Sequence, residues 1–228
     1  MLRLTPLLLA LLSGVIMYRF SAWRTARELD ARSVELADPA LRRRTDRLAR
    51  ALALPGIRVH IHEIEPINGL AAPDGRIFIT RGLYRKYIAG EISAEELTSV
   101  IAHELGHVAL GHSRRRMIDF SGQNALRTAL AMVLSRFLPG LGVYLAGFLT
   151  SLVAARMSRD DEFEADAYAS ALLMKAGIGT APQISMFEKL DALARSGSGT
   201  LPAWLMSHPK TEERIRAIRR NEKAWTRR

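Results

Sequence analysis

The chain has 228 residues, of which 48% are hydrophobic and 25% are charged, and it contains no cysteine. This composition excludes a disordered tail and a protein that crosses a membrane many times, and the length suffices for a buried core. The lack of cysteine excludes disulfide scaffolds, thiolate zinc sites, iron–sulfur clusters and thiol nucleophiles. The net charge of +10 indicates an anionic partner, either nucleic acid or a membrane surface.

The N-terminal segment is the first indication of a membrane. Residues 4–18 carry no charge, and residues 20–23 extend this apolar stretch to a marginal span of about 20 residues. Because no clear small-residue cleavage site comes after it, we expect residues 1–23 to form an N-terminal membrane anchor or uncleaved signal, of the kind found in a bacterial inner membrane, rather than an ordinary buried helix. The arginines from Arg19 to Arg32 favour a cytoplasmic position for the domain that follows, whereas a signal anchor usually has the opposite effect, so the face stays open.

The next part of the chain changes from helix to strand. Residues 24–54 are arginine-rich and helical in pattern, and we expect them to form a linker. Alternating apolar residues at 57–61 predict a strand, and residues 76–80 after the turn Pro73-Asp74-Gly75 predict another. These two strands predict a small β-hairpin or sheet.

Helices are predicted for most of the chain beyond these strands. Ser93 with Glu96 three residues later is typical of a capping box, which opens a helix that ends near Gly111. Residues 55–228 are therefore expected to form one domain of α+β class, mainly helical. The other predicted helices lie in the apolar stretch 124–156 with a break at Pro139-Gly140, at 159–175 with Ser158 as its cap, at 182–194, and from about 211 after the linker 196–199.

The apolar stretch 124–156 is a second candidate for membrane contact. Each half has about 15 residues, short of the roughly 20 that a spanning helix needs. Arg127 and Arg136 also fit poorly in hydrocarbon. An interfacial or re-entrant helical hairpin is therefore preferred over two spans, and a buried hairpin that packs over the adjacent helix stays open.

The motif His103-Glu104-Leu105-Gly106-His107 lies inside the helix that Ser93 opens. Residues i and i+4 share a helix face, so His103 and His107 can reach one metal ion, and Glu104 can reach a water on it. The apolar residues around the motif indicate a buried helix, and buried His and Glu side chains need partners or an ion. The motif therefore favours a zinc site over a surface helix with solvated histidines.

A catalytic zinc ion needs a third protein ligand and one open position. The metzincin pattern is excluded because Ser113 stands where that class has histidine. His112 is about 140° around the helix from His107, so we expect it to pack or to form a hydrogen bond with a ligand rather than to bind the same ion.

The acidic run 160–166 is the expected source of the third ligand. Glu162 and Asp166 share a helix face, whereas Glu164 points nearly opposite. One carboxylate on that face can bind the metal while the other orients an imidazole. A solvated acidic face is the alternative, but apolar residues between the acidic ones indicate a half-buried helix.

Four ordered segments resemble the membrane-associated gluzincin metallopeptidases, which include HtpX, the CAAX prenyl proteases and the quality-control proteases of the periplasm and mitochondria. The segments read NGLAAPDGRIFITRGL, HELGHVALGH, SRDDEFEADAYA and SHPKTEERI, between about residues 55 and 220. The resemblance implies peptide hydrolysis by one Zn²⁺ ion per chain, held by His103, His107 and Glu162, with Glu104 as the base.

The resemblance also implies supporting roles. Asp166 is expected to support a ligand histidine, and Arg214 to brace the fold. His208 is expected near the metal, where it either stabilises the oxyanion or occupies the fourth zinc position in a latent state. HtpX has paired spans before its active site and this chain has one candidate span, so its layout resembles the single-anchor or periplasmic relatives.

The sequence thus predicts a membrane-associated zinc metalloendopeptidase for protein quality control, with misfolded or membrane-associated proteins or peptides as substrates. The strand at 76–80 is expected to pair with an extended substrate. A catalytically idle membrane chaperone or scaffold with a zinc fold is an alternative. A nucleic-acid-binding protein is disfavoured because aromatic residues are only 7% and a nucleic-acid motif is lacking. The excess basic charge is therefore assigned to solvated faces and to anionic lipid headgroups.

Overall fold

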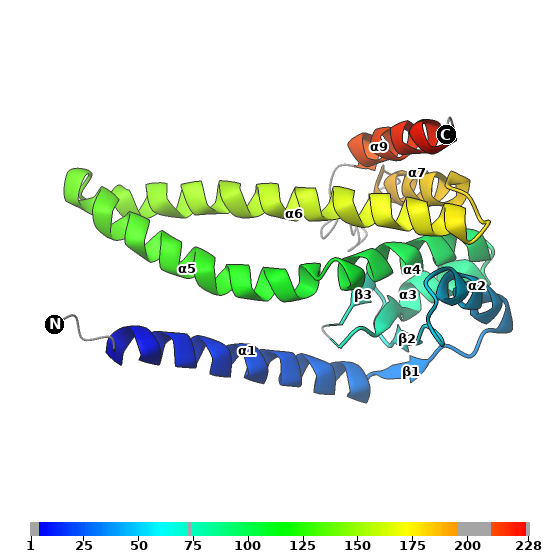
Figure 1. The fold of residues 1–228 in the computed structure, drawn as a ribbon, viewed down its shortest axis with the longest axis horizontal. Coiled ribbons are helices and arrows are strands. Elements are labelled where there is room, and N and C mark those ends of the chain that lie inside the picture. The colour runs from blue at the N-terminus through cyan, green and yellow to red at the C-terminus, as the bar shows by residue number, and fades with distance from the viewer. Residues whose placement is uncertain (1–4, 73, 196–210, 227–228) are drawn as a thin grey trace. The chain divides into compact units, whose positions relative to one another are not determined.

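A computed structural model describes residues 5–72, 74–195 and 211–226 of the chain (Figure 1). The chain divides into two compact units. One unit comprises residues 1–32 and 113–157, and the other comprises residues 33–112 and 158–228. The second unit contains the HExxH motif and the acidic run, so it is the unit in which the site is built.

A four-stranded mixed sheet forms the β part of this second unit, with the strand order β1-β2-β4-β3. Strands β1 and β2 are antiparallel, β2 and β4 are parallel, and β3 pairs with β4 as an antiparallel hairpin. This confirms the predicted α+β class and the small sheet that precedes the active helix. The strands span Ser33–Glu35 (β1), Val59–His62 (β2), Gly69–Ala71 (β3) and Ile77–Thr80 (β4).

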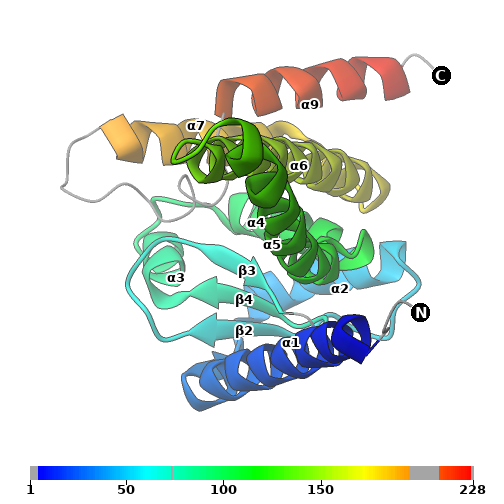
Figure 2. The same cartoon turned by 90° about the vertical axis from the view of Figure 1, so that its left-hand side faces the viewer.

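Helices cover this sheet and enclose one apolar core. Helix α4 lies along one face of the sheet, as Figure 2 shows, and it also packs on α2 and α7. Fully buried side chains of α2, β4 and α4, including Leu48, Ile79 and Ile101, belong to the core. The helices of this unit span Pro39–Ala51 (α2), Arg81–Ile88 (α3), Ala94–Ala109 (α4), Ala181–Arg195 (α7) and Thr211–Trp225 (α9), and α6 adds its C-terminal part.

Helix α4 begins where the capping box predicts. The Ser93 hydroxyl accepts a hydrogen bond from the backbone N–H of Glu96 at 3.1 Å, and the Glu96 carboxylate accepts one from the backbone N–H of Ser93 at 2.6 Å. The Glu96 carboxylate also accepts hydrogen bonds from Ser185 and Lys189 of α7. The cap therefore sets the start of the helix and fastens it to a neighbour, which orients the motif further along the helix.

The predicted helix start at Ser158 is wrong. Helix α6 runs without a break from Gly142 to Lys175, so Ser158 lies in its interior. The reason is that serine only favours a helix start and does not force one, whereas the glycines of α6 lie near its beginning and proline is absent from it. The acidic run is consequently carried on the second half of a 34-residue helix.

The other unit contains α1, at Thr5–Ala31, most of α5, at His112–Phe137, and the first part of α6. Helix α5 ends at Phe137 and α6 begins at Gly142, which places the break at Pro139-Gly140 as predicted. Among the described helices, none combines the length and apolarity needed to cross a membrane.

Candidate active site

The HExxH motif lies in the most buried part of α4. His103, Glu104 and His107 are 1%, 2% and 4% exposed. The two imidazoles lie on one helix face, with their Nε2 atoms 3.1 Å apart. Two nitrogen atoms buried this close need either a shared proton or a metal ion between them.

The acidic run of α6 faces this motif because the two helices approach closely at Gly106. A Cβ atom at Gly106 would lie 2.9 Å from the carbonyl oxygen of Ala165 and 3.0 Å from its Cα. Any larger residue at position 106 would therefore push α6 away. The glycine between the two histidines allows a carboxylate of α6 to reach the Nε2 atoms of α4.

Glu162 is the carboxylate that reaches them. Its two oxygens lie 3.4 Å from His103 Nε2 and 3.5 Å from His107 Nε2, and its side chain is almost fully buried. Tetrahedral zinc with N and O ligands at about 2.0–2.2 Å separates those ligand atoms by roughly 3.3–3.6 Å. The observed spacings of 3.1–3.5 Å and the donor set therefore fit a zinc ion.

Behind His103 stands a buried ion pair. Asp166 accepts a hydrogen bond from His103 Nδ1 at 2.9 Å, which directs the Nε2 lone pair of that ring at the metal position. Arg214 of α9 donates to both Asp166 oxygens, from Nε at 2.6 Å and from Nη2 at 2.8 Å. Arg214 Nη2 also lies 3.6 Å from Glu162. This guanidinium therefore balances the two buried carboxylates.

These contacts shift the pKa values of the groups concerned. Burial would lower the pKa of His103, but its hydrogen bonds with Asp166 and Glu162 outweigh burial and raise that pKa to about 9. Burial would raise the pKa of Asp166, but Arg214 and His103 lower it to about 2. Asp166 is therefore ionised at neutral pH, and zinc must displace a proton from His103 when it binds.

A different pair of partners stands behind His107. Its Nδ1 atom lies 2.9 Å from Nδ1 of His112, which is fully buried. Nε2 of His112 lies 3.1 Å from Glu164 and 3.7 Å from Asp161. Helix α4 ends before His112, because Gly111 adopts a φ of +70°, so the angle of 140° expected from one continuous helix does not describe this ring.

Glu164 has a contact that the helical-wheel prediction does not include. It points away from the face of Glu162 and Asp166, as predicted, but its carboxylate meets His112. The ring lies beside it because the chain turns at Gly111 and a new helix starts at His112. This is a long-range contact, and helical periodicity carries no information about it.

The edge of the sheet beside the motif is β3. Strand β4 lies between β2 and β3, so its backbone groups are already paired on both sides. The prediction that residues 76–80 pair with a substrate is therefore wrong, and β3 is the edge strand next to α4. A Cβ atom at Gly69 of β3 would lie 3.1 Å from the Glu104 carboxylate, so this glycine brings the edge against the proposed base.

His208 lies outside the described residues, so the structure brings together the other predicted site residues without it. Gly69, Gly106 and Glu164 are contributors to the site that sequence reasoning missed. For Gly106 a signal was available, because glycine in the interior of a buried helix often marks a close approach. For Glu164 the sequence offers no such signal.

Comparisons with known proteins agree with this geometry. The model of "Peptidase family M48" matches residues 35–222. Metalloprotease LoiP of Escherichia coli is 33% identical over 164 residues, covering 72% of this chain and 62% of LoiP. Metalloprotease YcaL of the same organism is 30% identical over 181 residues, covering 78% of this chain and 68% of YcaL. Mitochondrial metalloendopeptidase OMA1 of Danio rerio is 27% identical over 194 residues, covering 82% of this chain and 40% of OMA1.

The fold and the His–Glu–His motif facing a helix-borne glutamate are the arrangement of the HExxH class of zinc metallopeptidases. The matched segment spans most of the chain and includes every described residue of the site. The chain belongs to peptidase family M48. It aligns with between 40% and 68% of the lengths of the three relatives named above.

Proposed function

We propose that this protein is a membrane-associated zinc metalloendopeptidase that acts in protein quality control. The observation that carries the proposal is the convergence of His103, His107 and Glu162 on one point, with Glu104 beside them in the same helix as the histidines. Three such ligands bind one zinc ion per chain and leave a fourth position for water or substrate.

Each residue of the site has a separate role in the proposed peptide hydrolysis. Zinc bound at this site supplies Lewis-acid polarisation of the scissile carbonyl and lowers the pKa of water towards 7. Glu104 accepts the proton of the attacking water and delivers it to the leaving amine. Asp166 and Arg214 keep the His103 ring oriented, and the buried surroundings exclude competing water.

The substrate class is inferred from β3, which is an edge strand of the sheet among the described residues. An extended peptide can add to β3 through main-chain hydrogen bonds, which read little of the side-chain sequence. Misfolded and unfolded proteins expose more extended segments than compactly folded proteins do. This favours unfolded protein segments as substrates, in keeping with the names of the relatives as metalloproteases and a metalloendopeptidase.

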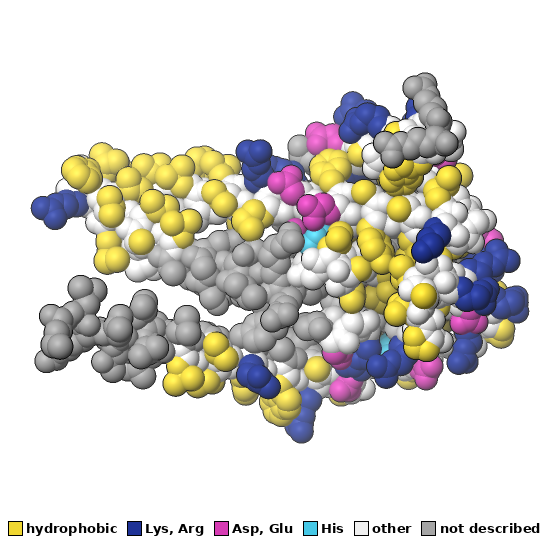
Figure 3. Space-filling view, viewed as in Figure 1, with side chains coloured by type: hydrophobic (Ala, Val, Ile, Leu, Met, Phe, Trp, Pro, Cys, Tyr) yellow, Lys and Arg dark blue, Asp and Glu magenta, His cyan; other side chains and the backbone are white. Residues whose placement is uncertain are grey.

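The proposed membrane contact rests on the turn between α5 and α6. Figure 3 shows hydrophobic side chains gathered over these helices, and Phe137 and Tyr144 are 74% and 77% exposed. Exposed apolar surface of this extent marks a membrane or protein contact. The other exposed large apolar residues of this turn and the described parts of the helices beside it are Leu126, Met132, Val133, Leu138, Leu141, Val143, Leu145, Phe148, Leu149, Leu152 and Val153.

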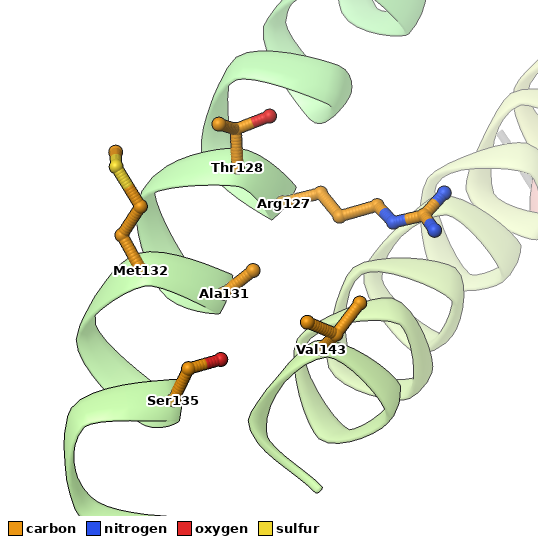
Figure 4. Close-up of a pocket in the computed structure, with 6 residues that line it drawn as sticks. All are labelled: Arg127, Thr128, Ala131, Met132, Ser135 and Val143. Carbon is orange, nitrogen blue, oxygen red and sulfur yellow. The ribbon is translucent and has the colours of Figure 1, made fainter. Parts of the chain in front are cut away.

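Arg127 is compatible with such an apolar surface. An open pocket of about 610 Å³ lies between the two helices. Figure 4 shows its lining residues, and in this view Arg127 extends from α5 towards α6. Its Nε atom lies 3.9 Å from the position that a Cβ atom would take at Gly147. The Arg127 charge is thus directed between the helices, whereas Arg136 in the last turn of α5 is exposed and can meet anionic headgroups. Together with residues 1–23, this turn would hold the protein at a bilayer.

The membrane contact is tested with vesicles. Replacing both Phe137 and Tyr144 by Glu places charges where apolar side chains would enter the acyl region, so co-sedimentation with anionic phospholipid vesicles should fall several-fold. The Phe137→Leu/Tyr144→Phe variant keeps the surface apolar and should bind as the wild type does. Equal vesicle binding by all three proteins would contradict the contact.

The activity is tested by zinc analysis and by cleavage of casein. Glu104→Gln should keep one zinc ion per chain. It should reduce casein cleavage by about 10²–10⁴-fold, which is the typical effect of losing a general base. Retained cleavage by this variant would refute the role of Glu104. Wild-type protein that binds zinc but does not cleave would favour the idle chaperone, and zinc-free protein that binds DNA would favour the basic nucleic-acid-binding alternative.

His208 keeps its two proposed roles. If it stabilises the oxyanion, His208→Ala should slow cleavage without changing the zinc content. If it occupies the fourth zinc position in a latent state, the same variant should be faster. Zinc content and casein cleavage, measured on one preparation, separate these outcomes.

A further inference from the structure

The proposed zinc site does not explain why a second histidine is buried directly behind one of its ligands. His112 is fully buried, and its Nδ1 lies 2.9 Å from Nδ1 of His107. A nitrogen pair at this distance is a hydrogen bond only if one atom carries the proton and the other offers a lone pair. The direction of this bond follows from the function of His107.

Zinc binding decides which atom donates. Nε2 of His107 faces the metal position, with His103 Nε2 at 3.1 Å and Glu162 at 3.5 Å. A neutral imidazole that binds metal through Nε2 carries its proton on Nδ1. His107 Nδ1–H is therefore the donor, and His112 Nδ1 is the acceptor.

The far side of His112 completes the chain of hydrogen bonds. Since Nδ1 accepts, the proton of the neutral ring is on Nε2, and Nε2 faces Glu164 at 3.1 Å and Asp161 at 3.7 Å. Both carboxylates can accept, and Glu164 is the one within hydrogen-bonding distance. The three contacts thus have one consistent direction, from His107 through His112 to Glu164.

A second metal ion at His112, Asp161 and Glu164 is the competing interpretation of the same cluster, because these three side chains also offer ligand atoms close together. A metal on His112 Nε2 would place the ring proton on Nδ1, where it would meet the Nδ1 proton of His107. The two hydrogens would repel at 2.9 Å between the nitrogens. The two metal sites therefore exclude one another, and the hydrogen-bonded chain is the arrangement compatible with zinc on His107.

We propose that His112 is a positioning residue that, backed by Glu164 and Asp161, holds His107 in the tautomer and orientation that bind zinc. The proposal rests on the proposed zinc site and adds the group that sets its affinity. Hydrogen-bond partners of this kind alter metal affinity by about 10–100-fold when they are removed. His112 does not touch substrate or metal, so its effect is on zinc retention before it is on turnover.

The test is zinc affinity, measured by competition with a chelator on the full-length protein in its metal-free form. His112→Ala removes the acceptor and should weaken zinc binding about 10–100-fold. His112→Asn places an amide oxygen near the position of Nδ1 and should restore the affinity to within a few-fold of the wild type. Glu164→Gln should have a smaller effect, because Asp161 stays beside His112.

Two controls separate positioning from general damage. The first control is the melting temperature of the metal-free protein, which measures damage to the fold. If His112 had only a structural role, His112→Asn and His112→Ala would have the same zinc affinity. Glu188→Gln matches Glu164→Gln, since Glu188 is a paired carboxylate with 57% side-chain exposure against 54% for Glu164, and it should leave zinc affinity unchanged.

Each result decides something. Tight zinc binding by the wild type and equally tight binding by His112→Ala would overturn this proposal and leave the proposed function intact. Failure of His112→Asn to restore affinity would refute the acceptor role. A second zinc ion per chain that disappears in Glu164→Gln would establish the competing metal site. Absence of zinc binding in the wild type would refute the proposed function itself.

Discussion

The two histidines of α4 are supported by chemistry of opposite kinds. Behind His103, a fully charged pair of Asp166 and Arg214 is closed off from solvent. Behind His107, the buried ring of His112 leads to Glu164, whose side chain is half exposed. The first support is costly to break because a buried charge would lose its partner, whereas the second ends at the surface, where water can replace a lost contact.

The difference shows how the site meets two requirements, which are stability of the fold and orientation of the metal ligands. The His103 side joins three helices, α4, α6 and α9, and so combines stability of the fold with orientation of a ligand. The His107 side joins α4 to α6 through the first residue of α5, His112, and its assigned role is orientation alone. The two sides are therefore expected to respond differently to substitution and to pH.

The largest effect is expected from Arg214→Met. This change leaves Asp166 as a buried carboxylate without its main counter-charge, and removing one partner of a buried pair costs about 3–5 kcal/mol. Urea denaturation of the metal-free protein measures the loss. Glu164→Gln on the other side should cost less than about 1 kcal/mol, as expected for an exposed pair. Similar losses of unfolding free energy in the two variants would contradict the proposed difference between the His103 side and the His107 side.

A smaller effect on stability is expected from Gly106→Ala, which affects both sides at once. The added methyl group would lie 2.9 Å from a backbone oxygen of α6, and overpacking of this kind costs about 1–3 kcal/mol. Because α6 carries Glu162, Asp166 and Glu164, its displacement should also weaken zinc binding. Unchanged zinc affinity in this variant would show that the helices need not approach so closely.

The smallest expected effect is the pH dependence of stability and of zinc affinity, which should differ between the His103 side and the His107 side. In the metal-free protein the pKa of His103 is raised from 6.5 to about 9, so its contribution to stability is complete below pH 6.5 and is lost as pH rises through 9. Zinc competes with that proton, so zinc affinity should rise about tenfold per pH unit up to about pH 9. Chelator competition between about pH 7 and about pH 9.5 measures this slope.

The control for the pH prediction is His112→Asn, which acts on the His107 side. It should keep the slope because the interactions of His103 are unchanged. A flat pH dependence in the wild type would contradict the raised pKa of His103. A slope lost in His112→Asn alone would assign the proton to the other side of the site.

Much of the site follows from local sequence, since His103 and His107 share a face by helical periodicity and Glu162 with Asp166 share another. The capping box also placed the start of α4 correctly. The uninterrupted course of α6 could not be predicted from local sequence, because serine is compatible with a helix interior. The edge position of β3 could not be predicted either, because strand order depends on pairing between distant segments.

The sequence by itself determined the class of chemistry, because without cysteine the zinc ligands had to be His and carboxylates, and helix geometry places two such groups on one face of each segment. Only the tertiary structure decided how these faces meet. The close approach at Gly106 brings Glu162 to the histidines, α9 brings Arg214 to Asp166, and the turn at Gly111 brings His112 behind His107. These contacts depend on packing between helices, which local periodicity does not encode.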